Sequence, residues 1–212
     1  MGVPCIMVLD TESSVCRTEH RRMLVSVAYE VIVFDPTTDT YHIESSGYHI
    51  ITPEAYTDPD PASVNVHQIP PTYAQQHGCP LFDVLSALRV VVEHYRPTAI
   101  VGHDIVGDIA LLVTEAMRCG LHHLFRWLSP TMICTKFLSM GPCAIPLPKH
   151  VTSDNMGILK WPNLEESYRL LVHHTDASSS APFEKHDARG DVARCRAIFS
   201  TIVSRQQTPP SP

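Results

Sequence analysis

Several signatures that would define a class of protein are missing from this chain. No apolar run approaches the roughly 18 residues of a membrane-spanning helix, so we expect no membrane contact. The formal charge is −6, which is the wrong sign for a protein that coats nucleic acid through a basic face. An enzyme that grips one strand end through metal ions is still allowed, because a carboxylate cluster is negative until cations bind. There is no internal repeat.

Cysteine is present but lacks the spacing of a zinc or disulfide framework. The count of seven is odd, and no two cysteines have CxxC spacing. Cys5 and Cys134 lie inside apolar runs. We interpret the cysteines as small core residues in a reducing compartment, which predicts an intracellular location. The choice among cytoplasm, nucleus and organelle matrix stays open.

The remaining composition favours one α/β domain. A chain of 212 residues with 44% hydrophobic content can bury a substantial core. We assign one domain to residues 1–205 and a disordered tail to 206–212, which reads QQTPPSP. The first predicted strand starts at Cys5, so we expect no cleavable signal or transit peptide.

Residue spacing predicts three strands in a meander, followed by alternating helices and strands. Alternating or continuous apolar runs predict strands at 5–9, 23–34, 40–51 and 99–102, and a strand or strand-to-helix segment at 132–138. Helical spacing or helix-end signals predict helices at 81–94, 108–119, 164–173 and 186–203. Loops are expected at 52–61, at 139–155 and, as a mobile segment, at 175–182. This order predicts a mixed sheet, an antiparallel meander plus parallel strands, flanked by helices.

Acidic residues stand beside several of these elements. Asp10 and Glu12 are two apart in extended chain, so their side chains project to the same side. Asp108 begins a predicted helix, where the macrodipole favours an acid without any function. His186 and Asp191 can face one cleft if the histidine stands on the loop before the last helix. Four carboxylates for divalent cations and one histidine for a proton are what two-metal phosphodiester hydrolysis requires.

Three segments, in order, resemble the exonuclease motifs of the DEDDh family, which includes the proofreading epsilon subunit of bacterial DNA polymerase III. They are CIMVLDTE at 5–12, VGHDIVGDIALL at 101–112 and HDARGDVARCRAIF at 186–199. Connecting segments resemble the family as well: VHQI at 66–69 is similar to its V-H-G-I turn, and similar stretches follow at 130–138 and 160–164. The resemblance spans nearly residues 5–203 and implies an RNase H-like fold.

The resemblance also implies an activity, that of a metal-dependent 3′→5′ exonuclease releasing nucleoside monophosphates. By position, Asp10, Glu12 and Asp191 would hold the catalytic Mg²⁺ or Mn²⁺. Asp108 would help to bind a second ion, partly through water. His186 would be the general base that deprotonates the attacking water, a task that suits a histidine at neutral pH.

Substrate contacts follow from the same resemblance. Val66 and His67 would pack against the terminal nucleotide of a single strand, with His186 swinging in beside it. The backbone around Thr11 and Glu12 would contact the 3′-hydroxyl. A polymerase or another protein partner that supplies processivity is compatible with the absence of basic extensions, and the oligomeric state is undefined.

Four positions depart from the family pattern. Val15 and Gln68 stand where the family has glycine, and Asp104 replaces an amide. Gly107 replaces an aromatic residue that commonly flanks the substrate, and such a ring contributes about 1–3 kcal/mol by stacking. None of these departures removes a metal ligand or the histidine.

Two alternatives to a DNA exonuclease therefore stay open. One is a nucleic-acid-binding or scaffold protein that kept this fold without turnover, and the other is an RNA-trimming exonuclease. Two further groups are interpreted mainly as ordinary surface residues. One is the paired histidines (His122, His123, His173 and His174). The other is two basic patches, which would otherwise neutralise phosphates of a strand entering the cleft (Arg17, Arg21 and Arg22; Lys185, Arg189, Arg194 and Arg196).

Overall fold

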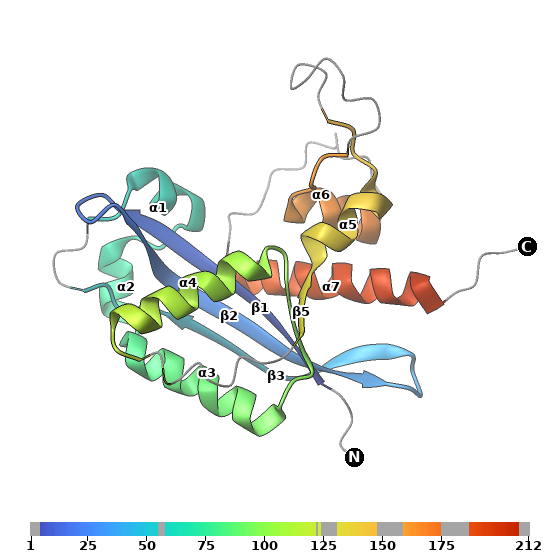
Figure 1. The fold of residues 1–212 in the computed structure, drawn as a ribbon, viewed down its shortest axis with the longest axis horizontal. Coiled ribbons are helices and arrows are strands. Elements are labelled where there is room, and N and C mark those ends of the chain that lie inside the picture. Colours follow the sequence, from blue (N-terminus) through green and yellow to red (C-terminus); the bar gives the residue numbers. More distant parts are fainter. Residues whose placement is uncertain are drawn as a thin grey trace, which may run out of the picture.

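A mixed β-sheet forms the centre of the structure (Figure 1). The computed structural model describes residues 5–54, 58–121, 123, 131–147, 159–174 and 187–207. Within these ranges the sheet has five strands in the order β3-β2-β1-β4-β5. They are β1 (Cys5–Cys16), β2 (Arg21–Asp35), β3 (Thr40–Ile50), β4 (Ala99–Gly102) and β5 (Thr131–Cys134). The first three are antiparallel, and β4 and β5 add in parallel. The predicted mixed sheet is confirmed.

Strand β1 continues well beyond the predicted end at residue 9. It pairs with β2 along its whole length, with Asp10 opposite Ala28 and Glu12 opposite Ser26. Its pairing with β4 stops at Val8, which lies opposite Val101. Beyond Val8, the edge of β1 that faced β4 has no neighbouring strand among the described residues. This part of β1 is therefore less enclosed, and polar side chains can be accommodated there.

Helices cover both faces of the sheet (Figure 1). Met7 and Leu9 of β1 pack with α3 (Leu81–Tyr95) and α4 (Ile105–Arg118) on one face. Val8 points to the opposite face and packs with α7 (Ala188–Gln207). Side chains alternate along a strand, so the two cores are separated by the strand itself.

Two short helices were not predicted. Helix α1 (Pro61–His67) and helix α2 (Pro71–His77) both begin with proline. Proline suits the first helical position, where its missing N–H is not needed, but in a sequence it also indicates a loop. The segment expected to form a turn at 66–69 is the end of α1, closed by Gln68 in the left-handed region with φ 58°.

The segment after β5 is more helical than predicted. The predicted irregular loop at 139–155 is wrong for its first five residues, because α5 (Thr135–Cys143) runs through Pro142. Only the last turn of the helix is affected by that proline, so the cost of the lost hydrogen bond is limited. Residues 148–155 of the predicted loop lie outside the described residues.

The predicted helix at 164–173 is confirmed, in two parts. Helix α6 (Leu164–Tyr168) begins at the predicted cap Asn163, whose side chain accepts from the Glu166 N–H in a capping box. The helix continues as the π-helix η2 (Arg169–His173). The histidines at its end, His173 and His174, are exposed.

Helix boundaries near the predicted motifs shift by a few residues. Helix α4 starts three residues before the predicted position, so Asp108 lies within its first turn. Helix α7 starts at Ala188 and includes residues 206 and 207 of the predicted tail. The predicted mobile loop at 175–182 and residues 208–212 lie outside the described residues.

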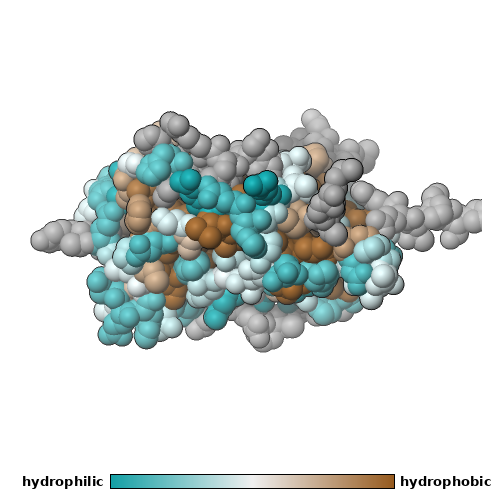
Figure 2. Space-filling view, turned by 90° about the horizontal axis from the view of Figure 1, so that it is seen from below, coloured by the Kyte–Doolittle hydropathy of each residue, from teal (hydrophilic) through white to brown (hydrophobic). Residues whose placement is uncertain are grey.

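Three further observations concern helix length, the surface and the cysteines. No helix within the described ranges combines the length and apolar character needed to cross a membrane. Seen from below, the molecule shows apolar patches separated by hydrophilic residues (Figure 2). No disulfide joins any of the seven cysteines.

Candidate active site

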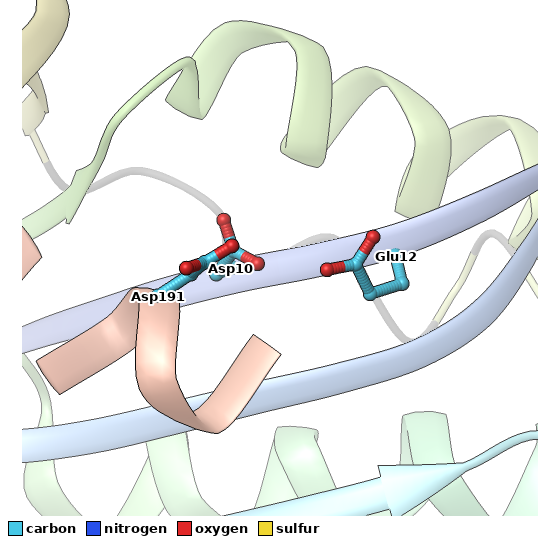
Figure 3. A group of neighbouring side chains, drawn as sticks. All are labelled: Asp10, Glu12 and Asp191. Atoms are coloured by element: carbon cyan, nitrogen blue, oxygen red, sulfur yellow. The ribbon is translucent and has the colours of Figure 1, made fainter. Parts of the chain in front are cut away.

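Three of the predicted metal ligands meet at the open side of β1. Asp10 and Glu12 come from the strand and Asp191 from the first turns of α7 (Figure 3). One carboxylate oxygen of each lies within 4.8 Å of the others. Asp10 and Glu12 share the side of β1 that Val8 presents to α7, so the strand's alternation directs both acids to Asp191.

The fourth predicted ligand reaches the same cavity from the opposite face. Thr11 alternates with its neighbours and turns toward α4, where its Oγ1 donates to Asp108 Oδ1 at 2.6 Å. Asp108 lines a cavity of about 530 Å³ together with Asp10 and Asp191. Asp108 is not in the three-carboxylate cluster, but its charge acts on Asp10 across the cavity.

The place of the cavity follows from the topology. Strand β4 ends at Gly102, and the chain then turns into α4. The carboxyl ends of parallel strands, where the chain leaves the sheet, form crevices in open α/β sheets. The end of β4 therefore opens the space that the acids of β1 line.

Burial and neighbouring carboxylates raise the pKa of three acids at the cavity, Asp10, Glu12 and Asp108. The pKa of Asp10 is raised well above its usual value by burial first, and then by Asp108, Asp191 and Glu12. Burial is also the main cause that raises the pKa of Glu12 to about 7 and that of Asp108 to about 7. Among the described residues, Asp10 Oδ2 is buried and accepts no hydrogen bond. Buried carboxylate oxygens short of counter-charge fit a hard divalent cation such as Mg²⁺ or Mn²⁺.

Arg194 supplies part of the missing positive charge. It lies one turn after Asp191 on α7, and its Nη1 contacts Asp191 Oδ1 at 2.7 Å. The two side chains are only 19% and 7% exposed, so the pair is poorly screened by water. Any cation that binds Asp191 must share the carboxylate with this arginine.

His103 holds two walls of the cavity together. Its Nε2 donates to the Pro162 carbonyl oxygen at 3.1 Å, and its Nδ1 accepts from the Thr135 hydroxyl at 3.0 Å. A carbonyl oxygen only accepts, so Nε2 carries the proton of the neutral ring. Burial lowers the pKa of His103 to about 4. His103 is therefore a neutral structural link between β4, α5 and the segment before α6.

The predicted substrate contacts are placed unequally. His67 is buried, with Nδ1 accepting from the Ile69 N–H at 3.1 Å and Nε2 donating to Ser14 Oγ at 2.8 Å. Its neighbour Val66 is 49% exposed. Nε2 of His67 thus holds the end of α1 to β1, and Nδ1 fixes the segment that follows α1. Nucleotide contact by Val66 and His67, and by the backbone at Thr11 and Glu12, stays a prediction.

The predicted general base, His186, lies outside the described residues. The next residue, Asp187, caps α7 by accepting from the Arg189 N–H at 3.1 Å. Helix α7, which carries Asp191, begins at Ala188. The role of His186 stays a prediction.

Sequence reasoning gave no role to two residues of the cavity, Lys136 and Trp161. Both belong to connecting segments, 130–138 and 160–164, whose likeness to the family carries no stated role. Of the basic residues assigned to the surface, Arg17 pairs with Asp58 and Arg21 with Glu115, whereas Arg22 lines the cavity.

Two departures from the family pattern also lie at the cavity. A side chain at Gly107 would first meet Asp104 at 3.5 Å, an ordinary contact. A Cβ would therefore fit at Gly107 beside the Asp104 side chain, where the glycine itself presents no side chain to the cavity. Lys136 Nζ lies 3.6 Å from Asp104 Oδ2 and compensates the charge that replaces an amide.

The chain is similar in fold to solved structures of one known protein. No family model and no curated protein sequence matches the chain. The structure of E. coli exonuclease I in complex with a 5cy-dA13 oligonucleotide matches over 96% of this chain, with a TM-score of 0.67 and 15% identity. The complex with 5cy-dT13 gives 0.68 at 15% identity over 97%, and apo exonuclease I gives 0.66 at 16% over 97%. The fold is RNase H-like.

The match covers only part of each exonuclease I chain. The chain spans about two fifths of the exonuclease I chains, with 41%, 42% and 43% covered. At this identity the likeness supports the sheet and the helices packed on it, and the activity of exonuclease I is not transferred by it. The RNase H-like fold implied by the motifs is thereby confirmed.

Proton binding by Glu12 predicts how the stability of the metal-free protein depends on pH. Its pKa is about 7 in the folded protein against the ordinary 4.5, so the folded state binds more protons between these values. The free energy of unfolding should therefore fall as pH rises through this interval. Glu12→Gln removes that contribution and should be more stable than the parent at pH 8, by about 1–3 kcal/mol.

Urea unfolding in EDTA at several pH values measures this difference. Glu44→Gln, at an exposed position of β3, is the control and should keep the parent's pH dependence. Equal pH dependence in Glu12→Gln and the parent would contradict the assignment.

Arg194 should weaken cation binding at Asp191. A divalent cation about 5 Å from a single positive charge is repelled by about 1.7 kcal/mol even at the dielectric constant of water. Arg194→Gln should therefore bind Mn²⁺ roughly tenfold more tightly in isothermal titration calorimetry. Arg196→Gln, which removes an arginine of α7 paired with Glu30, should bind Mn²⁺ as the parent does. Weaker binding by Arg194→Gln would mean that the arginine positions Asp191 instead.

Proposed function

We propose that this protein is a metal-dependent 3′→5′ exonuclease that hydrolyses phosphodiester bonds at the 3′ end of a single nucleic-acid strand and releases nucleoside monophosphates. The observation that carries the proposal is the meeting of Asp10, Glu12 and Asp191 at one edge of β1. Asp10 and Glu12 come from one motif and Asp191 from another far along the sequence, and Asp10 and Asp191 line one cavity with Asp108.

The likeness in fold supports the same proposal. Solved structures of E. coli exonuclease I contain dA13, dT13 and dA16 oligonucleotides, and one is described as a complex with single-stranded DNA in a zinc-bound form. This chain shares that fold and carries three acids beside the open edge of β1, which supports a comparable nuclease activity.

The acids fit two cations, Mg²⁺ or Mn²⁺. Asp10, Glu12 and Asp191 would hold one, and Asp108 would help to hold the second, partly through water. When bound, the two ions supply charge neutralisation for the phosphate and for the attacking and leaving oxygens. The Thr11 hydroxyl donates to one oxygen of Asp108 and orients this carboxylate at the cavity.

Other residues would bind and orient the strand. His186 would accept a proton from the attacking water. The backbone at Thr11 and Glu12 would contact the 3′-hydroxyl, and exposed Val66 would pack against the terminal nucleotide. His67 would act on the same contact by holding Val66 in place through its bond to Ser14.

A binding or scaffold role without turnover is the second candidate. Two observations favour it: Arg194 occupies one oxygen of Asp191, and Gly107 leaves out a ring that would flank the substrate. Assembly with a polymerase or another protein fits either candidate.

Hydrolysis by a strand-end nuclease should depend on Asp10. With Mn²⁺ and a 5′-labelled single strand, the parent should give a ladder that shortens from the 3′ end. Asp10→Ala should lose more than about 100-fold in rate, because even outer-shell residues of metal sites cost about 10- to 100-fold. Asp83→Ala, at an exposed position of α3, should remain active.

Three outcomes separate the candidates. Equal rates for the parent and Asp10→Ala would exclude the enzyme and leave the binding protein. A labelled mononucleotide as the first product would show that hydrolysis starts at the 5′ end, and the proposed 3′→5′ direction would be wrong. DNA and RNA strands of matched sequence, run in parallel, distinguish a DNA exonuclease from an RNA-trimming one.

The general base is tested separately from the metal site. His186→Ala should slow hydrolysis by about 10²- to 10⁴-fold, the usual contribution of a positioned base. Mn²⁺ affinity in calorimetry should stay unchanged, and the rate should lose its dependence on a group that titrates near neutral pH. His42→Ala, an exposed histidine on β3, is the control. An unchanged rate for His186→Ala would refute the assignment.

A further inference from the structure

Trp161 is a large aromatic side chain displayed at the acid-lined cavity. Its ring is 58% exposed, and the residue lines the same cavity as Asp10, Asp108 and Asp191. A tryptophan exposed to this extent contributes little to a core. Its position beside the site needs another reason.

The backbone that carries Trp161 is fixed on both sides. The Lys160 N–H donates to the Ile145 carbonyl at 2.8 Å, and the Pro162 carbonyl accepts from His103 at 3.1 Å. Asn163 then starts α6 with its capping box. The ring is therefore held at the cavity by a backbone that is already ordered, which lowers the entropy cost of binding there.

A cation stands next to the ring. Lys136 Nζ lies 5.4 Å from the centroid of the Trp161 ring, within cation–π range, and the lysine lines the same cavity. On the α4 wall of this cavity, Gly107 offers no side chain. The aromatic surface and its cation are thus on the α5–α6 wall.

We propose that Trp161, with Lys136 beside it, is a stacking platform for one unpaired base near the 3′ end of the bound strand. The proposal rests on the proposed function in that the same strand enters the acid site. Every base has a π-face, so a tryptophan platform accepts any base, while a lysine attracts the phosphate backbone. The platform favours single strands, because a base within a duplex is stacked between its neighbours.

Binding to an inactive variant tests the platform without hydrolysis. In the Asp10→Ala background with Mn²⁺, fluorescence anisotropy of a 5′-labelled oligonucleotide compares Trp161→Ala, Trp161→Phe and Phe137→Ala. Phe137 is the matched control, an exposed aromatic of α5 that does not line the cavity. We expect about 5- to 150-fold weaker binding for Trp161→Ala, a smaller loss for Trp161→Phe and none for Phe137→Ala.

Abasic strands identify the contact as stacking. Removing the base at one position among the last few nucleotides should weaken binding to the Trp161 protein and should not weaken binding to Trp161→Ala. Losses that add at every position would overturn stacking, as would equal affinity of Trp161→Ala and its parent for the complete strand.

Kinetics on active protein separate this proposal from the proposed function. With Asp10 intact, Trp161→Ala should raise KM more than it lowers kcat, whereas a merely destabilised protein would also unfold at lower urea. Activity that depends on Asp10 but not on Trp161 would keep the exonuclease and overturn the platform. Trp161-dependent binding with no hydrolysis would keep the platform and overturn the exonuclease. If the parent neither binds nor cuts any oligonucleotide, both are wrong.

Discussion

The site depends on the alternation of side chains along β1. Asp10 and Glu12 face α7, and Thr11 between them faces α4, so one strand reaches Asp191 on one face and Asp108 on the other. Pairing with β2 fixes this arrangement, because a slip of one residue would exchange the faces. The end of pairing with β4 at Val8 then leaves the acids beside an open cavity. The register of β1 in the sheet therefore also determines how the acids of the candidate site are arranged.

Charge is the second theme of the cavity. Burial first, and the neighbouring carboxylates second, raise the pKa of Asp10 and of Glu12, and basic side chains lie close to the acids. Arg194 contacts Asp191, Lys136 contacts Asp104, and Arg22 lines the cavity. The two arginines and the lysine lie in a chain of net charge −6. Local compensation of this kind lets an acidic protein present a surface that a polyanion can approach.

The mixed sheet and the meeting of three acids, Asp10, Glu12 and Asp191, were predicted from the sequence for different reasons. The strands followed from apolar alternation, but the meeting of Asp10 with Asp191 came from family motifs, since no periodicity links positions so far apart. Helices α1 and α2 were missed because proline at a helix start and proline in a loop look alike. The burial of His67 was missed because the depth of a turn depends on tertiary packing. Trp161 and Arg194 contact residues of another element or another turn, and no sequence pattern predicts these contacts.

His103 links the walls of the cavity in a form that does not change when the acids do. With a pKa of about 4, its ring stays neutral across the range in which Glu12 and Asp108 exchange protons. The bonds to Thr135 and Pro162 therefore do not depend on the protonation of Glu12 and Asp108. A change in the protonation of these acids therefore leaves the hydrogen bonds of His103 in place. Cation binding in the cavity need not rearrange the walls that His103 links.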